Sequence, residues 1–372
     1  MRRVFLIRHG EREDDGAGKR YIGITDSPLS PVGKKEAGKL SAFFSDLYKN
    51  SDPPLIFSSP LTRSIDTAVP TADSLAVIPV LWGGFKEIDL GSFEGMLISD
   101  VKKNYPGEYE KRGEHLGSYR PPGGESFEDA GKRFLEAFST ILSESDENKD
   151  ILIFTHSGVI RAALSLLSSE NLDKLREISI PNASISCLEY DGRSFEGIKY
   201  SGVRPLNLLD EEEIKKLYKK YQAPQNVIRH MRAVAVAANE IYEGIERDKR
   251  PALEPLIKAA LLHDLLRKEK NHAEAGADAL KKEGYPEIAE IVRLHHSDSI
   301  GIPPLGTPLT AVELLFYADK VVLEDRRVSV EERFRESRKK CLSEEALKKH
   351  GALYQTALLI ENRIDSVKRR HV

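Results

Sequence analysis

The sequence is poor in cysteine, tryptophan and methionine. Its 372 residues include only two cysteines, Cys187 and Cys341, together with one tryptophan and three methionines. Two cysteines are too few for a disulfide framework and are typical of a protein from a reducing compartment. We therefore expect a cytoplasmic protein.

The chain also lacks an excess of one charge and any long apolar run. Its formal net charge is only -3, so there is no overall basic field that would attract nucleic acid or a membrane surface. Only four apolar residues separate Met1-Arg2-Arg3 from Arg8, too few for the core of a signal peptide. No segment approaches the roughly 20 apolar residues of a membrane span. We expect neither a membrane nor a nucleic-acid partner, and nothing in the sequence indicates an oligomeric state.

The first half of the chain alternates short apolar runs with helical patterns. Three strong runs, 4–7, 55–57 and 151–154, read as buried strands separated by helices. Residues 185–190 and 195–200 read as a closing strand pair that turns at Asp191-Gly192. Strands that alternate with helices predict an α/β domain with three layers and a mostly parallel sheet.

The second half reads as helical throughout. Strand signals end near residues 201–205, and Asp210 opens a charged helix. Because 372 residues exceed one ordinary core, two domains are expected. We predict an α/β domain over residues 1–205 and an all-α domain over residues 206–372.

Polar residues follow three of the predicted strands at the point where each strand ends. One strand delivers Arg8 and His9, one leads into Arg63, and one delivers His156. The carboxyl ends of parallel strands meet at one edge of a sheet, which is where such sheets bind ligands. Two arginines and two histidines there suit an oxyanion, although Arg-His-Gly alone would also fit a solvated strand end.

If the oxyanion at this sheet edge is a phosphate ester that the site cleaves, an acid is needed as well. A glycine-rich loop offers several acids. Glu87 opens this loop, and Asp89 and Glu94 follow it closely. A carboxyl group there could protonate a leaving oxygen. Residue spacing alone leaves the choice among the three open.

Taken in order, these motifs resemble the histidine phosphatase (phosphoglycerate mutase-like) superfamily. The resemblance rests on residues 6–11, 23–30, 58–63, 87–95 and 155–161, and residues 121–126 further resemble the α-ribazole phosphatase branch. No long insertion follows Glu87, which favours a phosphatase over a mutase. The family implies a small phosphorylated metabolite as substrate and no metal in this domain.

The same resemblance implies a role for each site residue. His9 would attack phosphorus and form a phosphohistidine, while Glu87 would protonate the leaving oxygen and then activate water. The remaining residues would bind the phosphoryl oxygens. They are Arg8, Arg63 and His156, with Thr25 and Ser157 as further phosphate contacts.

The helical half places ionisable residues on apolar helix faces. His230, Asp264, His295 and Asp319 each continue the inner stripe of a different predicted helix, and His263 lies beside Asp264. A single histidine on such a face is usually a core residue. Several histidines with two carboxylates need compensating charge, and a divalent first-row metal ion supplies it.

This second pattern resembles the HD phosphohydrolase superfamily over residues 224–330. His230, His263, Asp264 and Asp319 match its four signature ligands in order, and His272, His295 and His296 match the extra histidines of members with two metals. Many members have lysine three residues after the aspartate. Here Arg267 takes that place and Lys268 follows, so the cation that would bind substrate differs in geometry.

The resemblances together imply a bifunctional phosphohydrolase. The helical domain would hydrolyse a nucleotide-like phosphoester with one or two ions of Fe, Mn, Zn, Co or Ni, and Asp264 would be the shared ligand if there are two. The alternative is a helical domain that senses a nucleotide without turnover and regulates the phosphatase. The sequence leaves the substrate of either domain open.

Overall fold

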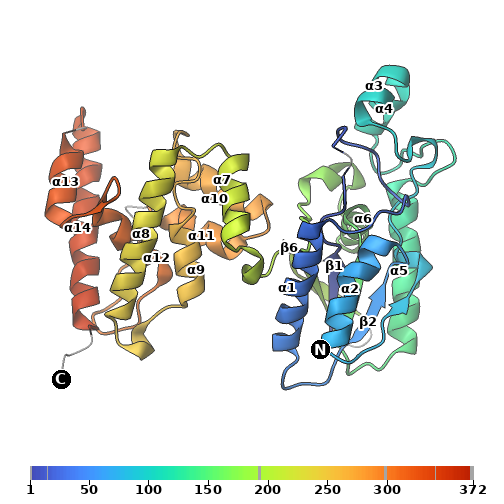
Figure 1. Cartoon of the computed structure of the whole chain (residues 1–372), viewed down its shortest axis with the longest axis horizontal. Coiled ribbons are helices and arrows are strands. Elements are labelled where there is room, and N and C mark those ends of the chain that lie inside the picture. Colours follow the sequence, from blue (N-terminus) through green and yellow to red (C-terminus); the bar gives the residue numbers. More distant parts are fainter. Residues whose placement is uncertain (1, 15, 192–193, 297–299, 340, 369–372) are drawn as a thin grey trace. The chain divides into compact units, whose positions relative to one another are not determined.

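The computed structural model describes residues 2–14, 16–191, 194–296, 300–339 and 341–368 (Figure 1). The chain divides into two compact units, Met1–Leu208 and Leu209–Val372. We refer to them as the sheet unit and the helical unit and describe each by itself.

The sheet unit is built on six strands in the order β3-β2-β4-β1-β5-β6. β1, β2, β3 and β4 run parallel to their neighbours, whereas β5 is antiparallel to both β1 and β6. The prediction of a mostly parallel sheet is confirmed. The strands span Arg2–Arg8 (β1), Leu55–Ser58 (β2), Val80–Leu81 (β3), Ile151–Thr155 (β4), Ile185–Tyr190 (β5) and Phe195–Val203 (β6).

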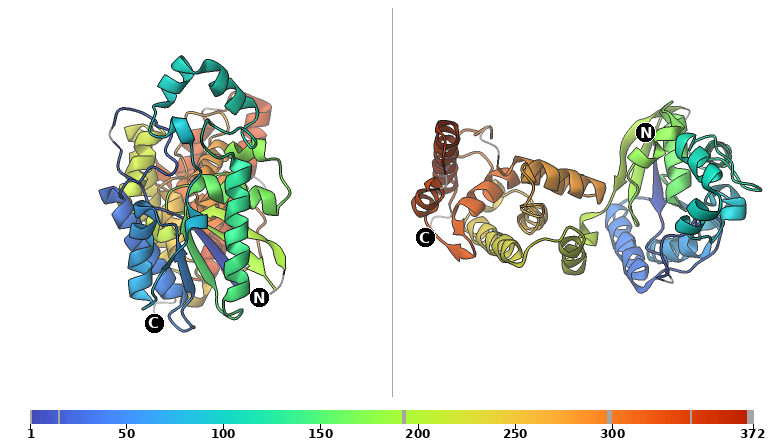
Figure 2. Two further views of the ribbon diagram at one scale, coloured as in Figure 1. Left: turned by 90° about the vertical axis from the view of Figure 1, so that its right-hand side faces the viewer. Right: turned by 90° about the horizontal axis from the view of Figure 1, so that it is seen from above.

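Helices cover both faces of this sheet, as Figure 2 shows. Alternate residues of a strand point to opposite faces. Val4 and Leu6 of β1 therefore pack with Phe134 and Phe138 of α5 on one side. Phe5 and Ile7 pack with residues of α1 and α2 on the other side. This double burial explains why the strands read as continuous apolar runs rather than as alternating ones.

Local sequence signals account for the helix starts in the sheet unit. Ser30 caps α1 by accepting a hydrogen bond from the Gly33 amide, and a proline follows at the first position. The turn predicted at Asp191-Gly192 includes Gly192, which lies outside the described residues. The helices and short 3-10 turns are α1 (Pro31–Leu47), α2 (Thr62–Ser74), η1 (Gly83–Phe85), η2 (Gly91–Phe93), α3 (Ile98–Asn104), α4 (Pro106–Glu114), α5 (Phe127–Glu144), α6 (Ser157–Leu167), η3 (Leu172–Glu177) and η4 (Leu206–Leu208).

The helical unit opens as predicted, with Asp210 accepting a hydrogen bond from the Glu213 amide. The all-helical expectation missed one small feature, a ribbon of two strands with two residues each, too short to show strand periodicity. The elements are α7 (Glu211–Lys220), α8 (Gln225–Glu243), η5 (Arg247–Lys249), α9 (Leu253–Ala260), α10 (His272–Lys282), α11 (Pro286–Leu294), α12 (Ala311–Lys320), β7 (Val322–Leu323), β8 (Arg326–Arg327), α13 (Val330–Arg338) and α14 (Glu344–Ser366).

One helix of this unit is shorter than predicted. The inner stripe of α9 was expected to reach Asp264, but the helix ends at Ala260 and residues 261–268 form tight turns. The amide of Leu265 donates to the carbonyl of Leu262, and that of Arg267 donates to Asp264, each three residues back rather than four. This tighter winding buries the neighbouring side chains of His263 and Asp264 together.

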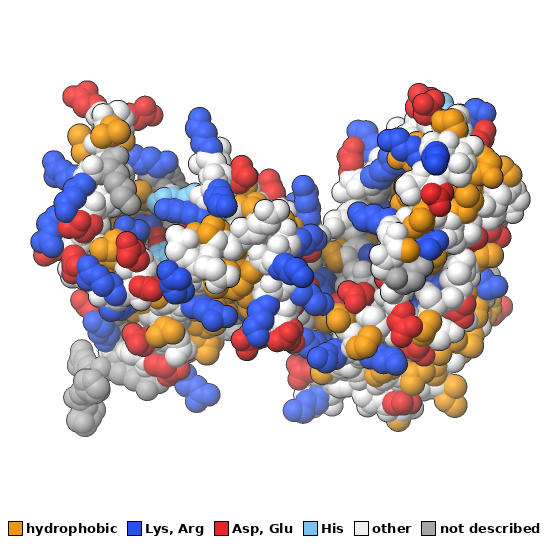
Figure 3. Space-filling model, turned by 45° about the horizontal axis from the view of Figure 1, so that its top comes forward, with side chains coloured by type: hydrophobic (Ala, Val, Ile, Leu, Met, Phe, Trp, Pro, Cys, Tyr) orange, Lys and Arg blue, Asp and Glu red, His pale blue; other side chains and the backbone are white. Residues whose placement is uncertain are grey.

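The surface agrees with the near-zero net charge. On the face shown in Figure 3, Lys and Arg side chains are mixed with Asp and Glu over both units. Within the described ranges, no helix combines the length and apolar character needed to cross a membrane.

Candidate functional sites

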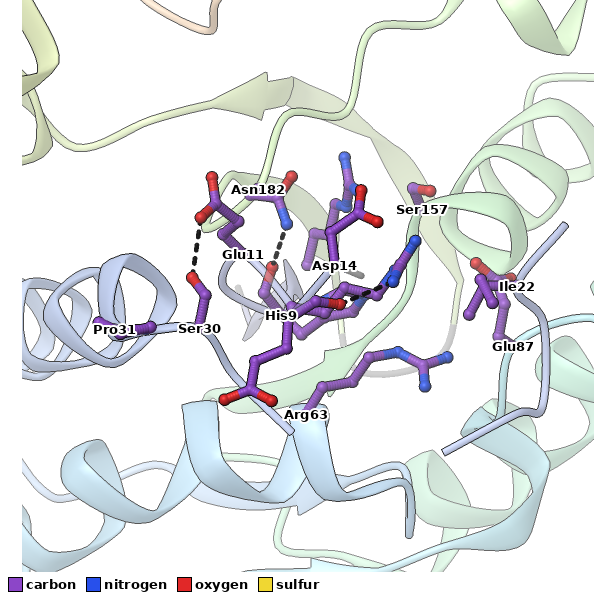
Figure 4. Close-up of a pocket in the computed structure, with 13 residues that line it drawn as sticks. His9, Glu11, Asp14, Ile22, Ser30, Pro31, Arg63, Glu87, Ser157 and Asn182 are labelled. Atoms are coloured by element: carbon purple, nitrogen blue, oxygen red, sulfur yellow. Dashed lines mark hydrogen bonds between the residues drawn. The ribbon is translucent and has the colours of Figure 1, made fainter. Parts of the chain in front are cut away.

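The parallel strands bring the predicted polar residues of the sheet unit to one edge. Arg8 ends β1, His156 directly follows β4, and Arg63 lies in the first turn of α2. A pocket of about 680 Å³ opens there (Figure 4). Its lining comprises Arg8, His9, Glu11, Arg12, Glu13, Asp14, Ile22, Ser30, Pro31, Arg63, Glu87, Ser157 and Asn182.

His9 has the geometry of a neutral nucleophile. Its Nδ1 atom lies 2.6 Å from the carbonyl oxygen of Gly10. A carbonyl only accepts, so Nδ1 carries the hydrogen and Nε2 keeps its lone pair. Burial, and after it the charges of Arg8 and Arg63, lowers the pKa of His9 well below its usual value. The imidazole is therefore uncharged at neutral pH.

Arg8 and Arg63 supply fixed positive charge beside His9. Nη1 of Arg8 donates to the carbonyl of Ile180 at 2.6 Å, and Arg63 donates to two backbone carbonyls at 2.7 and 2.9 Å. Burial, with repulsion from Arg161, lowers the pKa of Arg8 to about 10, which leaves it charged at neutral pH. Its Nε is buried and has no hydrogen-bond partner in the described part of the chain. An oxyanion would supply that partner.

His156 is fully buried, and its ring centroid lies 5.2 Å from that of His9. Its Nε2 is 2.8 Å from the hydroxyl of Ser59, and its buried Nδ1 has no partner among the residues that the structure describes. Burial, followed by the charge of Arg63, lowers the pKa of His156 well below its usual value. His156 is therefore a neutral side chain beside His9, but it is not one of the described residues that line the pocket.

Glu87 reaches the pocket from the loop after η1 and is held by the start of α6. Oε1 accepts hydrogen bonds from the amides of Ile88 and Val159, and Oε2 accepts one from Gly158, each at 3.0 Å. Since a carboxylate oxygen has two lone pairs, Oε2 can accept one more hydrogen bond. That oxygen is the one placed to exchange a proton with a ligand.

The two other candidate acids are engaged elsewhere. Asp89 accepts a hydrogen bond from Gly91, and Glu94 accepts from the amides of Gly23, Ile24 and Thr25. Neither acid is among the described residues that line the pocket. The geometry therefore favours Glu87.

The structure separates the two predicted phosphate contacts. Ser157 lines the pocket, but the hydroxyl of Thr25 donates to Glu94 at 2.5 Å and Thr25 is not one of the described lining residues. Asn182, which the sequence reasoning missed, lines the pocket, and its Nδ2 lies 3.4 Å from the carbonyl oxygen of His9. Asn182 belongs to no motif, so only its place before β5 could have indicated it.

The helical unit gathers its predicted ligands from separate elements. His230 lies on α8, His263 and Asp264 in the turns after α9, His295 at the end of α11, and Asp319 on α12. His272, the first residue of α10, joins them, with its ring centroid 5.7 Å from that of His295. The candidate ligands therefore lie together, although His263, Asp264 and His295 lie beyond the ends of their helices rather than on the predicted inner faces.

Three of the histidines are oriented by backbone carbonyls. Nδ1 of His230 lies 2.6 Å from the Glu324 oxygen, Nδ1 of His263 2.9 Å from that of Ala260, and Nδ1 of His295 2.5 Å from a carbonyl of α11. Each Nδ1 therefore carries a hydrogen. Nε2 of His263 and of His295 keeps its lone pair, whereas Nε2 of His230 lies 3.0 Å from Oδ1 of Asp319 and donates to it. This arrangement is typical of metal-binding histidines.

The donor atoms form two overlapping groups that fit divalent cations. His230, His263 and Asp319 make one group, and His263, Asp264 and His295 make the other, with donor atoms within 4.8 Å of one another. Within the described chain, Nε2 of His263 is buried and has no hydrogen-bond partner. Nitrogen and carboxylate donors suit a transition metal, although Lys320 and Arg267 already neutralise part of the carboxylate charge.

Asp264 faces both groups. Its Oδ2 lies 3.7 and 3.9 Å from Nε2 of His263 and His230, and its Oδ1 lies 3.3 and 3.9 Å from Nε2 of His272 and His295. Each oxygen of Asp264 therefore faces a different set of histidines, as expected of a ligand shared by two metal ions.

Three further predicted residues lie near these groups: Arg267 and Lys268, expected to bind substrate, and His296, which belongs to neither group of described donors. Arg267 and Lys268 are both exposed. Nη1 of Arg267 lies 3.3 Å from Oδ1 of Asp264 and 2.9 Å from Nε2 of His272. His296 stacks on the ring of His295, and repulsion from Lys320, with burial, lowers the pKa of His296 to about 3.

The sequence reasoning missed one basic residue in the helical unit. Lys320 is buried, and its Nζ lies 2.6 Å from Oδ2 of Asp319. Burial opposes ionisation of Asp319, but Lys320 and the hydrogen bond from His230 outweigh it and hold the pKa of Asp319 well below its usual value. The carboxylate is therefore ionised and able to bind a cation.

Known proteins resemble both units. Residues 4–201 match the model of the histidine phosphatase superfamily (branch 1), and residues 227–347 match that of the HD domain. A 6-phosphofructo-2-kinase/fructose-2,6-bisphosphatase of Arabidopsis thaliana is 34% identical over 181 residues, which are 48% of this chain and 23% of that protein. The bifunctional protein Rv2228c of Mycobacterium tuberculosis is 31% identical over 194 residues, 52% of each chain.

The matched part spans about half or less of the length of these curated relatives. Among solved structures, that of Bacillus stearothermophilus YhfR matches with a TM-score of 0.50 and 24% identity, covering 56% of this chain and all of that one. This likeness supports the fold. The chain belongs to the histidine phosphatase superfamily, and its helical unit carries an HD domain.

Proposed function

We propose that the sheet unit is a phosphomonoesterase, a phosphoric ester hydrolase that works through a phosphohistidine. The observation that carries the proposal is His9, whose Nδ1 is bound to the Gly10 carbonyl while Nε2 keeps its lone pair beside two buried arginines. Nε2 attacks phosphorus, and the bond from phosphorus to the leaving oxygen breaks. Arg8 and Arg63 stabilise the charge on the equatorial oxygens.

Glu87 acts as acid and then as base. Oε2, with its remaining lone pair, carries the proton that the leaving oxygen receives. It then removes a proton from the water that attacks the phosphohistidine, which releases inorganic phosphate and restores His9. Both steps use His9, Glu87 and water, with Arg8 and Arg63 as the fixed charges.

His9→Ala tests this mechanism. Loss of the nucleophile should reduce turnover of p-nitrophenyl phosphate by on the order of 10³-fold or more. Rapid quenching with labelled substrate should trap an acid-labile, base-stable phosphoenzyme in the parent protein and none in the variant. His115→Ala, an exposed histidine outside the pocket, is the matched control. A phosphoenzyme that persists in His9→Ala would exclude His9 as the nucleophile.

A second cavity in the same unit bears on the substrate. It measures about 380 Å³ and contains Arg112, Arg161 and Arg176 together with aromatic side chains. Arg112 is 7% exposed, its guanidinium lies 5.2 Å from the ring centroid of Tyr21, and its Nη1 has no hydrogen-bond partner within the described ranges. α6 carries Ser157 into the phosphate pocket and Arg161, one turn later, into this cavity.

We infer that the substrate carries a second anionic group, which this cavity binds. The names of several relatives state a bisphosphorylated substrate for those proteins, which agrees with the inference. Arg112→Met should raise KM about tenfold for a phosphomonoester with a second phosphate and leave p-nitrophenyl phosphate unaffected. Arg120→Met removes an exposed arginine paired with Asp129 and is the control. Equal effects on both substrates would contradict a second anion site.

We propose that the helical unit is a metal-dependent phosphohydrolase acting on a nucleotide-like phosphoester. The overlapping groups around Asp264 carry this proposal. A divalent transition metal bound there supplies the positive charge that polarises a phosphoryl oxygen and acidifies water. Carbonyl-bound Nδ1 atoms orient the rings of His230 and His263, and Lys320 keeps Asp319 ionised.

The alternative is a nucleotide sensor without turnover. Arg267 and Lys268 offer phosphate-binding charge for either function. Product formation on a panel of nucleotide phosphoesters, with and without Mn²⁺ or Co²⁺, separates the two proposals. Binding of a nucleotide without product, in protein of known metal content, would favour the sensor.

A further inference from the structure

The segment Pro121–Ser126 packs directly on the loop that bears Glu87. A Cβ atom on Gly124 would lie 2.6 Å from the carbonyl oxygen of Asp89. Gly91 has a φ of +51°, and a Cβ atom there would lie 2.3 Å from the carbonyl oxygen of Pro122. Two backbones therefore touch where only glycine fits. The amide of Glu125 adds a hydrogen bond to this contact by donating to the carbonyl oxygen of Asp89 at 2.8 Å.

Arg133 of α5 holds the same loop from its other side. Nη1 donates to the carbonyls of Gly84 and Lys86 at 2.8 and 3.1 Å, and Nη2 donates to the carbonyl of Glu87 at 3.2 Å. Nε and Nη2 also bind the two oxygens of Glu125, each at 2.9 Å. These bonds use all five N–H groups that a guanidinium offers.

Glu125 connects Arg133 to the loop that bears Glu87. Its Oε2 accepts from the amide of Asp89 at 3.1 Å while both oxygens bind Arg133. The side chains of Arg133 and Glu125 are 27% and 26% exposed, so the pair is partly shielded from water. The ion pair therefore connects α5 to the backbone on both sides of Glu87.

We propose that Arg133, fixed by Glu125, is the positioning residue of the acid Glu87; the inference rests on the proposed phosphatase mechanism. α6 holds the carboxylate of Glu87 through two amides, and Arg133 holds its carbonyl. The acid is thereby fixed at both ends. A proton donor must lie within hydrogen-bond reach of the leaving oxygen, and a displacement of about 1 Å can cost about 10²-fold in rate.

The test compares an alkyl phosphate, whose leaving group needs a proton, with p-nitrophenyl phosphate, whose leaving group does not. Arg133→Met should slow kcat for the alkyl phosphate about tenfold or more and change the p-nitrophenyl rate less than about twofold. Arg133→Lys should not restore the rate on the alkyl phosphate, because lysine keeps the positive charge but lacks the planar guanidinium that makes these five hydrogen bonds. Lys132→Met, next on α5 and exposed, is the control.

A double variant shows whether Arg133 acts through Glu87. In a Glu87→Gln background, Arg133→Met should cause no further loss of the alkyl rate, because the acid is already absent. Additive losses would overturn the proposal, and so would full rescue by lysine, which would indicate an effect of charge alone. If Arg133→Met does not fold, Glu125→Gln, which keeps the shape but weakens the pair, should give a smaller shift in the same direction. If Glu87→Gln itself leaves the substrate preference unchanged, the acid assignment fails rather than the positioning role.

Discussion

The phosphate chemistries proposed for the two units rest on different buried charges. The sheet unit places Arg8 and Arg63 around a neutral His9, so positive charge belongs to the protein. The helical unit places ionised Asp319 and Asp264 among histidine side chains, a donor set that suits an added cation beside Lys320 and Arg267. On these proposals, the carboxylates placed among the histidines, rather than the histidines themselves, separate the metal centre from the covalent centre.

Chelation should separate the two units most sharply. EDTA should remove hydrolysis of a nucleotide phosphoester by the helical unit and leave phosphomonoester turnover by the sheet unit unchanged, because only the first depends on added positive charge. Both rates are measured on one preparation, before and after metal is restored. The His9→Ala variant gives the helical unit's share of p-nitrophenyl phosphate turnover. If EDTA also abolishes the His9-dependent share, the contrast between the units is wrong.

Metal content should sharpen the comparison next. Because Asp264 directs one oxygen to each group, Asp264→Ala should lower the content from about two equivalents to nearly none, whereas His272→Ala should lower it to about one. Elemental analysis of protein purified without chelator measures both. His350→Ala changes a histidine that contacts Ser337 on α13 and serves as the control. A parent protein that holds at most one ion when metal is abundant would refute the two-metal interpretation.

Glu87→Gln should have a smaller but selective effect in the sheet unit. Loss of a general acid should slow an alkyl phosphate on the order of 10²-fold and p-nitrophenyl phosphate far less. Steady-state kcat values on the two substrates measure this ratio. Asp89→Asn is the control, since Asp89 lies in the same loop but not in the described pocket lining. Equal slowing of both substrates would mean that Glu87 only shapes the loop.

The comparison also shows why the sequence predicts one site more completely than the other. In the sheet unit, the site residues Arg8-His9 and His156-Ser157 are adjacent in sequence at the ends of two strands. Because these strands pair in parallel, their ends lie at the same edge of the sheet. In the helical unit, apart from the adjacent His263 and Asp264, the candidate ligands lie far apart in sequence, and only the 3.6-residue period connects them.

What the sequence could not predict depends on contacts between distant segments. The sequence around Thr25 does not show that its hydroxyl donates a hydrogen bond to Glu94, 69 residues away. Likewise, the tight turns after α9 follow from three-residue hydrogen bonds that hydrophobic periodicity does not encode. The Arg112 cavity was missed because its residues come from separate helices and form no motif.

The smallest expected effect is the pH dependence of the sheet unit's stability. The folded-state pKa values of His9 and His156 are lowered, mainly by burial and then by Arg8 and Arg63 near His9 and by Arg63 near His156. Below about pH 6.5 the unfolded chain binds protons that the folded unit does not, so stability falls as the pH falls. Each histidine contributes up to about 1.4 kcal/mol per pH unit.

The single tryptophan makes this measurable without the helical unit. Trp82 lies in the sheet unit, packed against its core, so its fluorescence follows unfolding of that unit alone. Urea unfolding between pH 7 and 5, in a buffer without phosphate, should show a smaller loss of stability for His9→Asn than for the parent protein. His115→Asn, at an exposed position, should leave the loss unchanged. An identical pH dependence in His9→Asn and the parent would mean that His9 takes up its proton as readily folded as unfolded, and the neutral nucleophile that sets this unit apart from the metal centre would be lost.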